Sequence, residues 1–359
     1  MATYKLTCLT PTLIGDGQEL APIDYMVWKD QVNVLDQRRI FKLFAKGPRL
    51  DGYLAQIKRS DRLDFASWGG LAQNYAGRRI AFESPSVTKH IEKAAAQDLF
   101  IRTFAAGPGG IYVPGTVVKG ALRTGAMFGG MNEEGWKRVA DQLATAERIP
   151  RRLAGPVEDR AVRNQLKSVM AGDSEPIPVA PSTLVYLLRT ATLAGVAGGK
   201  YELAWKQFRG SVRDAASSMP AFVEMARPGS MFTGSWKGNA TSALTAAREF
   251  SRAILTSHLN WARMAGLAKA GEAAQSLLTQ LEGLSGNQCL LPLGWGSGFL
   301  GKAAIADASP ENIRQVLRKL PFYARAIQTG MPFPKTRRIV FLGDQPATLP
   351  GWTLLEIGS

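Results

Sequence analysis

The spacing of hydrophobic residues predicts strands and helices mixed along the chain. Tyr4, Leu6 and Cys8 alternate with polar residues, which is the period of a half-buried strand. Two β-favouring runs on either side of Lys29-Asp30-Gln31 predict a hairpin over residues 24–35. Further strands are predicted at residues 110–113, 183–188, 229–236, 289–293, 338–342 and 352–357.

Helical spacing is found between these strands. One helix is expected to begin at a Thr116 cap and another at an Asn132 cap. Residues 49–79 show no sustained period and predict an insertion or a projecting loop region. Other helices are expected over residues 37–44, over residues 243–261, and after a Ser309 cap with Pro310 at the first helical position.

The irregular order of these elements favours an α+β fold over a regular βαβ array. The 359 residues suggest two domains, since a domain takes about 150 residues. Residues 151–174 are basic and contain Gly155 and Pro156, so the boundary is placed there. We therefore predict an N-terminal domain over residues 1–174 and a C-terminal domain over residues 175–359, which carries a glycine-rich loop.

The charge balance favours polyanionic partners. Lys and Arg outnumber Asp and Glu by 44 to 29, a net charge of +15. Cys8 and Cys289 are too few for a disulfide framework or a thiolate zinc site, so a reducing cytoplasm is expected. The first residues lack a signal-peptide pattern, and the uncharged run over residues 283–301 is too rich in glycine for a membrane span. Neither export nor a membrane location is expected.

Residues 294–302, Gly-Trp-Gly-Ser-Gly-Phe-Leu-Gly-Lys, match two nucleotide-binding patterns. From Gly296 they satisfy the dinucleotide fingerprint and, as far as Lys302, the phosphate-loop pattern. However, Ala303 stands where a phosphate loop needs a hydroxyl for magnesium, and too few alternating elements follow for a dinucleotide-binding unit. A nucleotide-binding enzyme and a purely structural tight turn are the alternatives. We interpret the loop as backbone that approaches an anionic polymer, with Lys302 at its edge.

Residues 114–123 predict a second anion-binding turn. Lys119 falls in the first turn of the predicted helix, where the helix dipole disfavours a cation by about a few tenths of a kcal/mol. A bound anion would remove that penalty, and Arg123 lies one turn further on the same face. With Gly115 and Thr116 in the turn itself, the segment predicts a phosphate clamp. The alternative is two solvated cations on an exposed helix face.

The segment before the strand at residues 338–342 is also basic. Lys335, Arg337 and Arg338 fit contact with a nucleic-acid backbone as readily as a solvated sheet edge. Some aromatic residues beside the basic turns could stack on bases or belong to the core: Tyr112, Trp295 and Phe299.

In this order the segments resemble the RAMP superfamily of CRISPR-Cas proteins. The resemblance is to the family of the fifth Csm subunit, which caps one end of a type III-A effector complex. Residues 9–17 (LTPTLIGDG) and 24–36 are similar to that family's early strand, glycine turn and hairpin. Residues 114–123 resemble its most specific motif, and residues 293–302 resemble the glycine-rich loop of the superfamily. Segments similar to its closing strands lie at residues 334–337 and 350–352.

The resemblance implies two ferredoxin-like, RNA-recognition-type domains with insertions. It also implies that the subunit binds CRISPR RNA, caps the 3′ end of this guide and contacts backbone RAMP subunits and small helical subunits, with target RNA as a further partner. No catalytic residue, metal or cofactor is expected in this role. The predicted RNA contacts are Gly115, Thr116, Lys119, Arg123, Gly294, Gly296, Gly298, Lys302, Lys335, Arg337 and Arg338.

The alternative on the same fold is a metal-dependent endoribonuclease subunit that cuts target RNA. The cleaving paralogue of these complexes uses a loop aspartate with a divalent metal. No aspartate here aligns clearly with it, so the noncatalytic role is preferred, and Asp16 and Asp24 are the residues to test. His90 and His258 are isolated in the sequence, which disfavours a histidine-centred nuclease.

Overall fold

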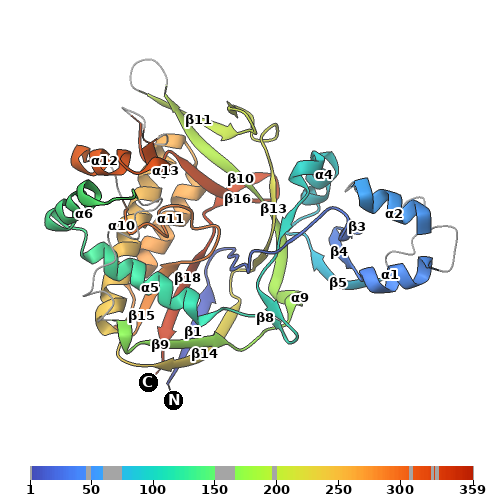
Figure 1. Ribbon diagram of the computed structural model, residues 1–359, viewed down its shortest axis with the longest axis horizontal. Helices are drawn as coiled ribbons and strands as arrows, with labels where there is room; N and C mark the ends of the chain where they lie inside the picture. Colours follow the sequence, from blue (N-terminus) through green and yellow to red (C-terminus); the bar gives the residue numbers. More distant parts are fainter. Residues whose placement is uncertain are drawn as a thin grey trace.

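The computed structural model mixes helices and sheets, which confirms the predicted α+β class (Figure 1). It describes residues 2–45, 50–59, 75–149, 166–195, 200–306, 310–324, 327 and 331–358. Most of the basic segment that was predicted to contain the domain boundary lies outside these ranges, as does the predicted Ser309 cap.

A five-stranded antiparallel sheet contains the first and last strands of the chain. The first strand contributes Tyr4, Leu6 and Cys8 to the hydrophobic core beneath this sheet, and all three are buried as their alternation predicted. Two helices, α5 (Gly115–Gly129) and α10 (Thr241–Ala265), pack against each other and against this sheet. In sheet order the strands are β15 (Gln288–Pro292), β18 (Trp352–Ile357), β1 (Ala2–Cys8), β14 (Met231–Lys237) and β9 (Met170–Ser174).

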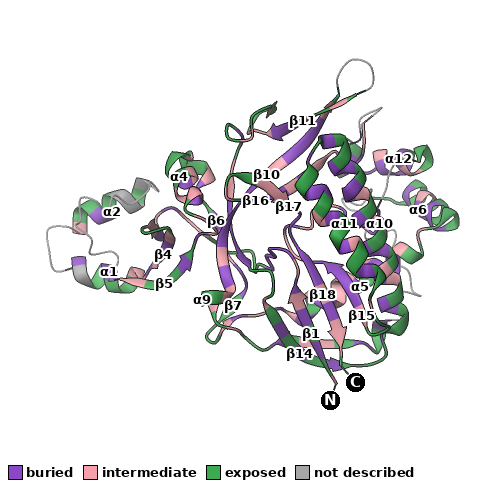
Figure 2. Ribbon diagram, turned by 180° about the vertical axis from the view of Figure 1, so that it is seen from behind, coloured by how far each residue is buried: buried purple, intermediate pink, exposed green. Residues whose placement is uncertain are grey.

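Close backbone packing joins the two helices. A Cβ on Gly125 of α5 would lie 2.7 Å from the Cα of Ala247 on α10, so only glycine allows this approach. Helix α11 (Ala268–Glu282) folds back along α10 after a left-handed Gly266. Figure 2 shows buried residues along the strands and the inner sides of α10 and α11.

An eight-stranded sheet is built around β10 (Thr183–Gly195), which is longer than the predicted 183–188 strand. Its second half is buried because it pairs with both a hairpin partner and a strand near the end of the chain. The other strands of this sheet are β2 (Glu19–Leu20), β6 (Ile101–Arg102), β11 (Tyr201–Lys206), β12 (Ser211–Val212), β13 (Ala221–Ala226), β16 (Thr336–Leu342) and β17 (Gln345–Thr348).

A small unit projects from the large sheet (Figure 1). The predicted hairpin is present in it, and Lys29 and Asp30 both have positive φ, as a tight two-residue turn requires. The region predicted as an insertion forms a helix and a strand of this unit where it is described. The unit comprises β3 (Tyr25–Val27), β4 (Gln31–Leu35), β5 (Ala76–Ala81), α1 (Gln37–Phe44) and α2 (Leu50–Arg59).

Short elements connect these parts. Helix α6 begins at the predicted cap, where the Asn132 side chain accepts a hydrogen bond from the Gly135 N–H at 2.9 Å. This helix spans Glu133–Thr145. The other short elements are α4 (Ser86–Lys93), β7 (Ala106–Gly107), β8 (Gly110–Ile111), α9 (Val179–Ser182), α12 (Glu311–Arg318) and α13 (Pro321–Ala324).

Strand pairing crosses the predicted boundary at residue 174. Strand β1 lies between β14 and β18, and β6 pairs with β13, so each large sheet combines strands from both halves of the sequence. The halves are therefore interleaved in both sheets, and their division into two folding units stays a prediction. None of the helices in the described residues is long and apolar enough to cross a membrane.

Candidate nucleic-acid interface

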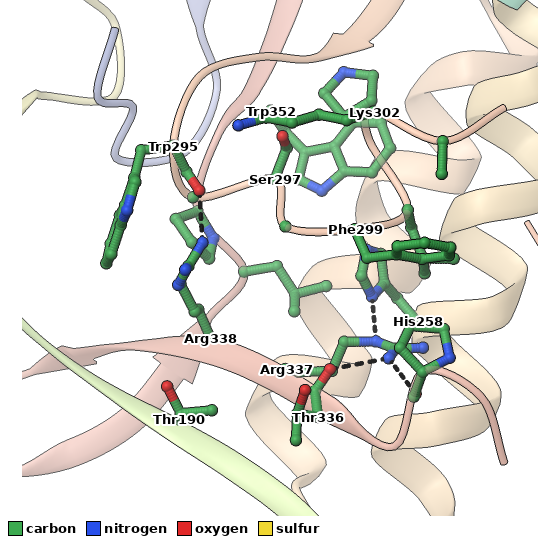
Figure 3. Close-up of a pocket in the computed structure, with 18 of the residues that line it drawn as sticks. Thr190, His258, Trp295, Ser297, Phe299, Lys302, Thr336, Arg337, Arg338 and Trp352 are labelled. Carbon is green, nitrogen blue, oxygen red and sulfur yellow. Dashed lines mark hydrogen bonds between the residues drawn. The ribbon is translucent and has the colours of Figure 1, made fainter. Parts of the chain in front are cut away.

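A cleft of about 580 Å³ lies where three of the predicted segments converge (Figure 3). Helix α5 contributes Arg123, the glycine-rich loop contributes residues 295–300 and 302–303, and strand β16 contributes residues 336–338. Of the predicted turn at residues 114–123 only Arg123 lines the cleft, together with most of the predicted glycine-rich loop. This convergence brings Arg123, Gly296, Gly298, Lys302, Arg337 and Arg338 around the same cavity.

The glycine-rich loop is held against the turn that follows β1. The Trp295 N–H donates to the Leu13 carbonyl at 3.0 Å, and the Gly351 N–H donates to the Pro11 carbonyl at 2.9 Å. Gly294 has a φ of +75°, and a Cβ there would overlap the Leu13 carbonyl oxygen. A Cβ on Gly296 would lie 2.6 Å from Pro350. Contacts within the protein therefore require these two glycines, whereas Gly298 has space for a Cβ and is favoured by its left-handed φ of +67°.

We expect Gly294→Ala to destabilise the protein by at least about 1 kcal/mol, because alanine meets both a left-handed backbone and the Leu13 carbonyl. Gly286→Ala is the control, since Gly286 has ordinary φ and open space at the Cβ position. It is expected to stabilise by about 0.4–1 kcal/mol. Chemical denaturation measures both, and equal effects would contradict the assigned role of Gly294.

Arg338 stacks on the aromatic residue of the loop. Its guanidinium lies 3.8 Å from the Trp295 ring centroid and donates to the Trp295 carbonyl at 2.6 Å. Arg102 of β6 lies 4.9 Å from the same ring. Burial, together with the nearby charge of Arg102, lowers the pKa of Arg338 to about 10. This pair of cations beside one indole favours an incoming anion.

Arg337 points away from Arg338, into the protein. Only 7% of it is exposed, and its Nε donates to Nδ1 of His258 at 2.9 Å. A second nitrogen donates to the carbonyls of Pro334 and Thr336. Burial lowers its pKa to about 9. The prediction that Arg337 contacts RNA conflicts with this placement, because its donors hold α10 against the start of β16.

The structure places Lys335 outside the cleft and His258 on the buried face of α10. Lys335 is half-buried and does not line the cleft; burial and the charge of Lys206 lower its pKa. His258 lines the cleft, but burial and then the Arg337 charge lower its pKa well below the usual value. It is therefore a neutral acceptor for Arg337 rather than a titrating base near neutral pH.

Helix α5 begins one residue before the predicted cap. Its N-cap is Pro114, and the Gly115 N–H donates to the Asp173 carboxylate of β9 at 2.8 Å. The predicted Thr116 cap is wrong, and an internal carboxylate occupies the position expected to hold a phosphate. Further along the helix, Lys119 is half-buried, and exposed Arg123 reaches the cleft.

Two residues at this site had no strong signal in the sequence. Arg102, the second residue of β6, lies beside the Trp295 ring rather than in the lining of the cleft, whereas Thr190 lines the cleft and lies in the half of β10 that was not predicted. Both reach the site only through the pairing of the eight-stranded sheet. Among the stacking candidates, Trp295 and Phe299 line the cleft, whereas Tyr112 lies outside it.

The two candidate aspartates lie in loops near the start of the chain, Asp16 between β1 and β2 and Asp24 between β2 and β3. Asp16 accepts from the Gln18 N–H at 3.0 Å, and Asp24 accepts from the Ala21 N–H at 2.8 Å. Each therefore stabilises its own local turn. Within the described ranges, no three His, Cys, Asp or Glu side chains are grouped to hold a metal ion.

Neither family models nor curated proteins match this sequence. Among solved structures, the chain is similar to a chain of the cryo-EM Csm–crRNA–target RNA ternary complex of a type III-A CRISPR-Cas system, with a TM-score of 0.61 and 19% identity over 99% of this chain and 100% of that one. It is also similar to the crystal structure of Csm5 from T. onnurineus, with a TM-score of 0.59 and 19% identity over 97% and 99% of the two chains. The resemblance seen in the sequence is confirmed at the level of the fold.

Proposed function

We propose that this chain is a noncatalytic, CRISPR RNA-binding subunit of a type III effector complex that caps the 3′ end of the guide. The observation that carries the proposal is the convergence of Arg123, Lys302 and Arg338 on one cleft, in a chain with the fold of Csm5. Phosphates attract such a cation cluster whatever the base sequence. In the complex, the neighbours of this subunit would be backbone RAMP subunits, small helical subunits and target RNA.

We further infer that the five-stranded sheet forms one ferredoxin-like unit. The chain order β1, α5, β9, β14, α10, β18 gives the βαββαβ pattern, with further elements inserted between β1 and α5, between α5 and β9, between β9 and β14, and between α10 and β18. Across the sheet, these strands stand as the fourth, first, third and second of that pattern, with β15 added at one edge. This unit draws on both sides of residue 174. A second ferredoxin-like domain remains a proposal based on the family resemblance.

The noncatalytic role is supported by the local use of both candidate aspartates. Asp16 and Asp24 each accept a hydrogen bond from the backbone of their own loop, which accounts for carboxylates at those positions without a metal. The lysine and arginine side chains at the cleft supply binding rather than proton transfer.

Purification of the tagged full chain from its native cells tests the proposal. A short RNA of defined length and several smaller subunits are expected to co-purify, and their absence would overturn the proposed function. The purified assembly carrying Asp16→Ala or Asp24→Ala is expected to cut target RNA as the unmodified assembly does. Loss of a single cut in either variant would instead support the endoribonuclease alternative.

A further inference from the structure

The interior of the cleft differs from its charged rim. Phe299 lines the cleft and is half-buried. Its ring is fixed by edge-to-face contacts with Tyr323 and Phe333, at centroid distances of 5.0 and 5.2 Å. Such contacts hold a flat apolar surface in place before any ligand arrives.

The opposite side of the cleft presents a second flat group. Figure 3 shows Trp295 and Arg338 on one side, with Phe299 on the other. Because Arg338 lies 3.8 Å from the indole centroid and bonds to the Trp295 carbonyl, its guanidinium is restrained. Guanidinium planes and aromatic rings are the two kinds of side chain on which unstacked RNA bases rest.

Hydroxyl groups and cations complete the site. Thr190 and Thr336 line the cleft on adjacent strands of the large sheet, and each hydroxyl both donates and accepts hydrogen bonds. Arg123 and Lys302 supply positive charge from α5 and the loop. The volume of about 580 Å³ lies within the range of small-ligand pockets, whereas contact with a phosphate backbone alone needs only a surface.

We propose that the cleft takes up one unpaired nucleotide of the bound RNA. The base lies between Phe299 and the Arg338–Trp295 stack, and its phosphate faces Arg123 and Lys302. This inference rests on the proposed function and extends it, because a backbone contact becomes a pocket that fixes the register of the RNA. Thr hydroxyls suit any base edge, so the pocket selects an unstacked base rather than a particular sequence.

Fluorescence of 2-aminopurine, placed at successive positions of the guide in the assembled complex, tests this pocket. At one position of the guide, the fluorescence of 2-aminopurine is expected to differ from that at the other positions. Thr336→Phe fills the cleft and should abolish that response, whereas Thr233→Phe on the exposed face of β14 should preserve it. Phe299→Leu, which keeps an apolar side chain but removes the ring, should weaken guide binding by about fivefold or more, as expected for a lost base stack.

An abasic nucleotide at the responsive position provides a second measurement. It should weaken binding as Phe299→Leu does, and the combination should add little further loss, because both changes remove the same stack. If guide RNA binds but no position gives a distinct 2-aminopurine signal, or if neither Thr336→Phe nor Phe299→Leu changes that signal, the pocket is overturned and the proposed function is left intact. An assembly without guide RNA would overturn both.

Discussion

Replacing Arg78 with alanine is expected to lower the free energy of unfolding by about 3–5 kcal/mol at pH 7, the usual loss when one partner of a buried ion pair is removed. Arg78 of β5 pairs with Glu224 of β13, whose side chain is fully buried and also accepts from the Phe104 N–H and the Thr183 hydroxyl. The pair joins the projecting unit to the large sheet.

The loss should depend on pH in a defined direction. Burial raises the pKa of Glu224, and the Arg78 charge opposes that rise. Without Arg78 the folded-state pKa of Glu224 moves further above its unfolded value. The protonated carboxyl then contributes stability below the unfolded pKa, and that contribution is lost as pH rises through the folded pKa. The difference between variant and unmodified protein should therefore be smaller at pH 5 than at pH 7.

Urea denaturation at both pH values measures this difference. Arg79→Ala is the matched control, because Arg79 is the exposed neighbour of Arg78 on the same strand. Its effect is expected to stay within about 0.5 kcal/mol. An Arg78→Ala loss no larger than the control, or one that is equal at both pH values, would contradict the assigned role of the ion pair.

Removing two cations from the cleft is expected to cause the largest loss of RNA binding. Arg123→Ala with Lys302→Ala removes about two phosphate contacts, which should lower affinity for single-stranded RNA by about 10- to 100-fold at 50 mM salt. Fluorescence anisotropy with the full chain measures the affinity. Arg263→Ala with Lys269→Ala removes the same charge from exposed sites outside the cleft and should change affinity far less.

Local patterns in the sequence predicted those elements whose formation depends on neighbouring residues of the chain. The alternation of Tyr4, Leu6 and Cys8, the hairpin over residues 24–35 and the Asn132 cap are all present. The start of α5 was misplaced because its N-terminal Gly115 N–H is satisfied by Asp173, which comes from a strand far along the chain. Sequence periodicity carries no information about such a partner.

The candidate site was predicted in part for the same reason. The glycine loop and Arg123 were found from turn and helix signals, and the structure brings them together. Arg337 and Arg338 were both predicted to contact RNA, although neighbouring residues of a strand point to opposite faces. Only Arg338 reaches Trp295, while Arg337 is buried against α10. Both line the cleft, but which of the two stacks on Trp295 and which is buried depends on the sheet pairing, which the sequence pattern leaves open.

The salt dependence of RNA binding tests the central claim most directly. For the unmodified chain and the Arg123→Ala, Lys302→Ala double variant, the logarithm of the association constant is measured against the logarithm of salt concentration. The account predicts a slope that is smaller in magnitude by about 1.4 in the double variant, since each phosphate contact to a single strand contributes about 0.7. Parallel lines for the two proteins would show that the RNA lies elsewhere and would contradict the account.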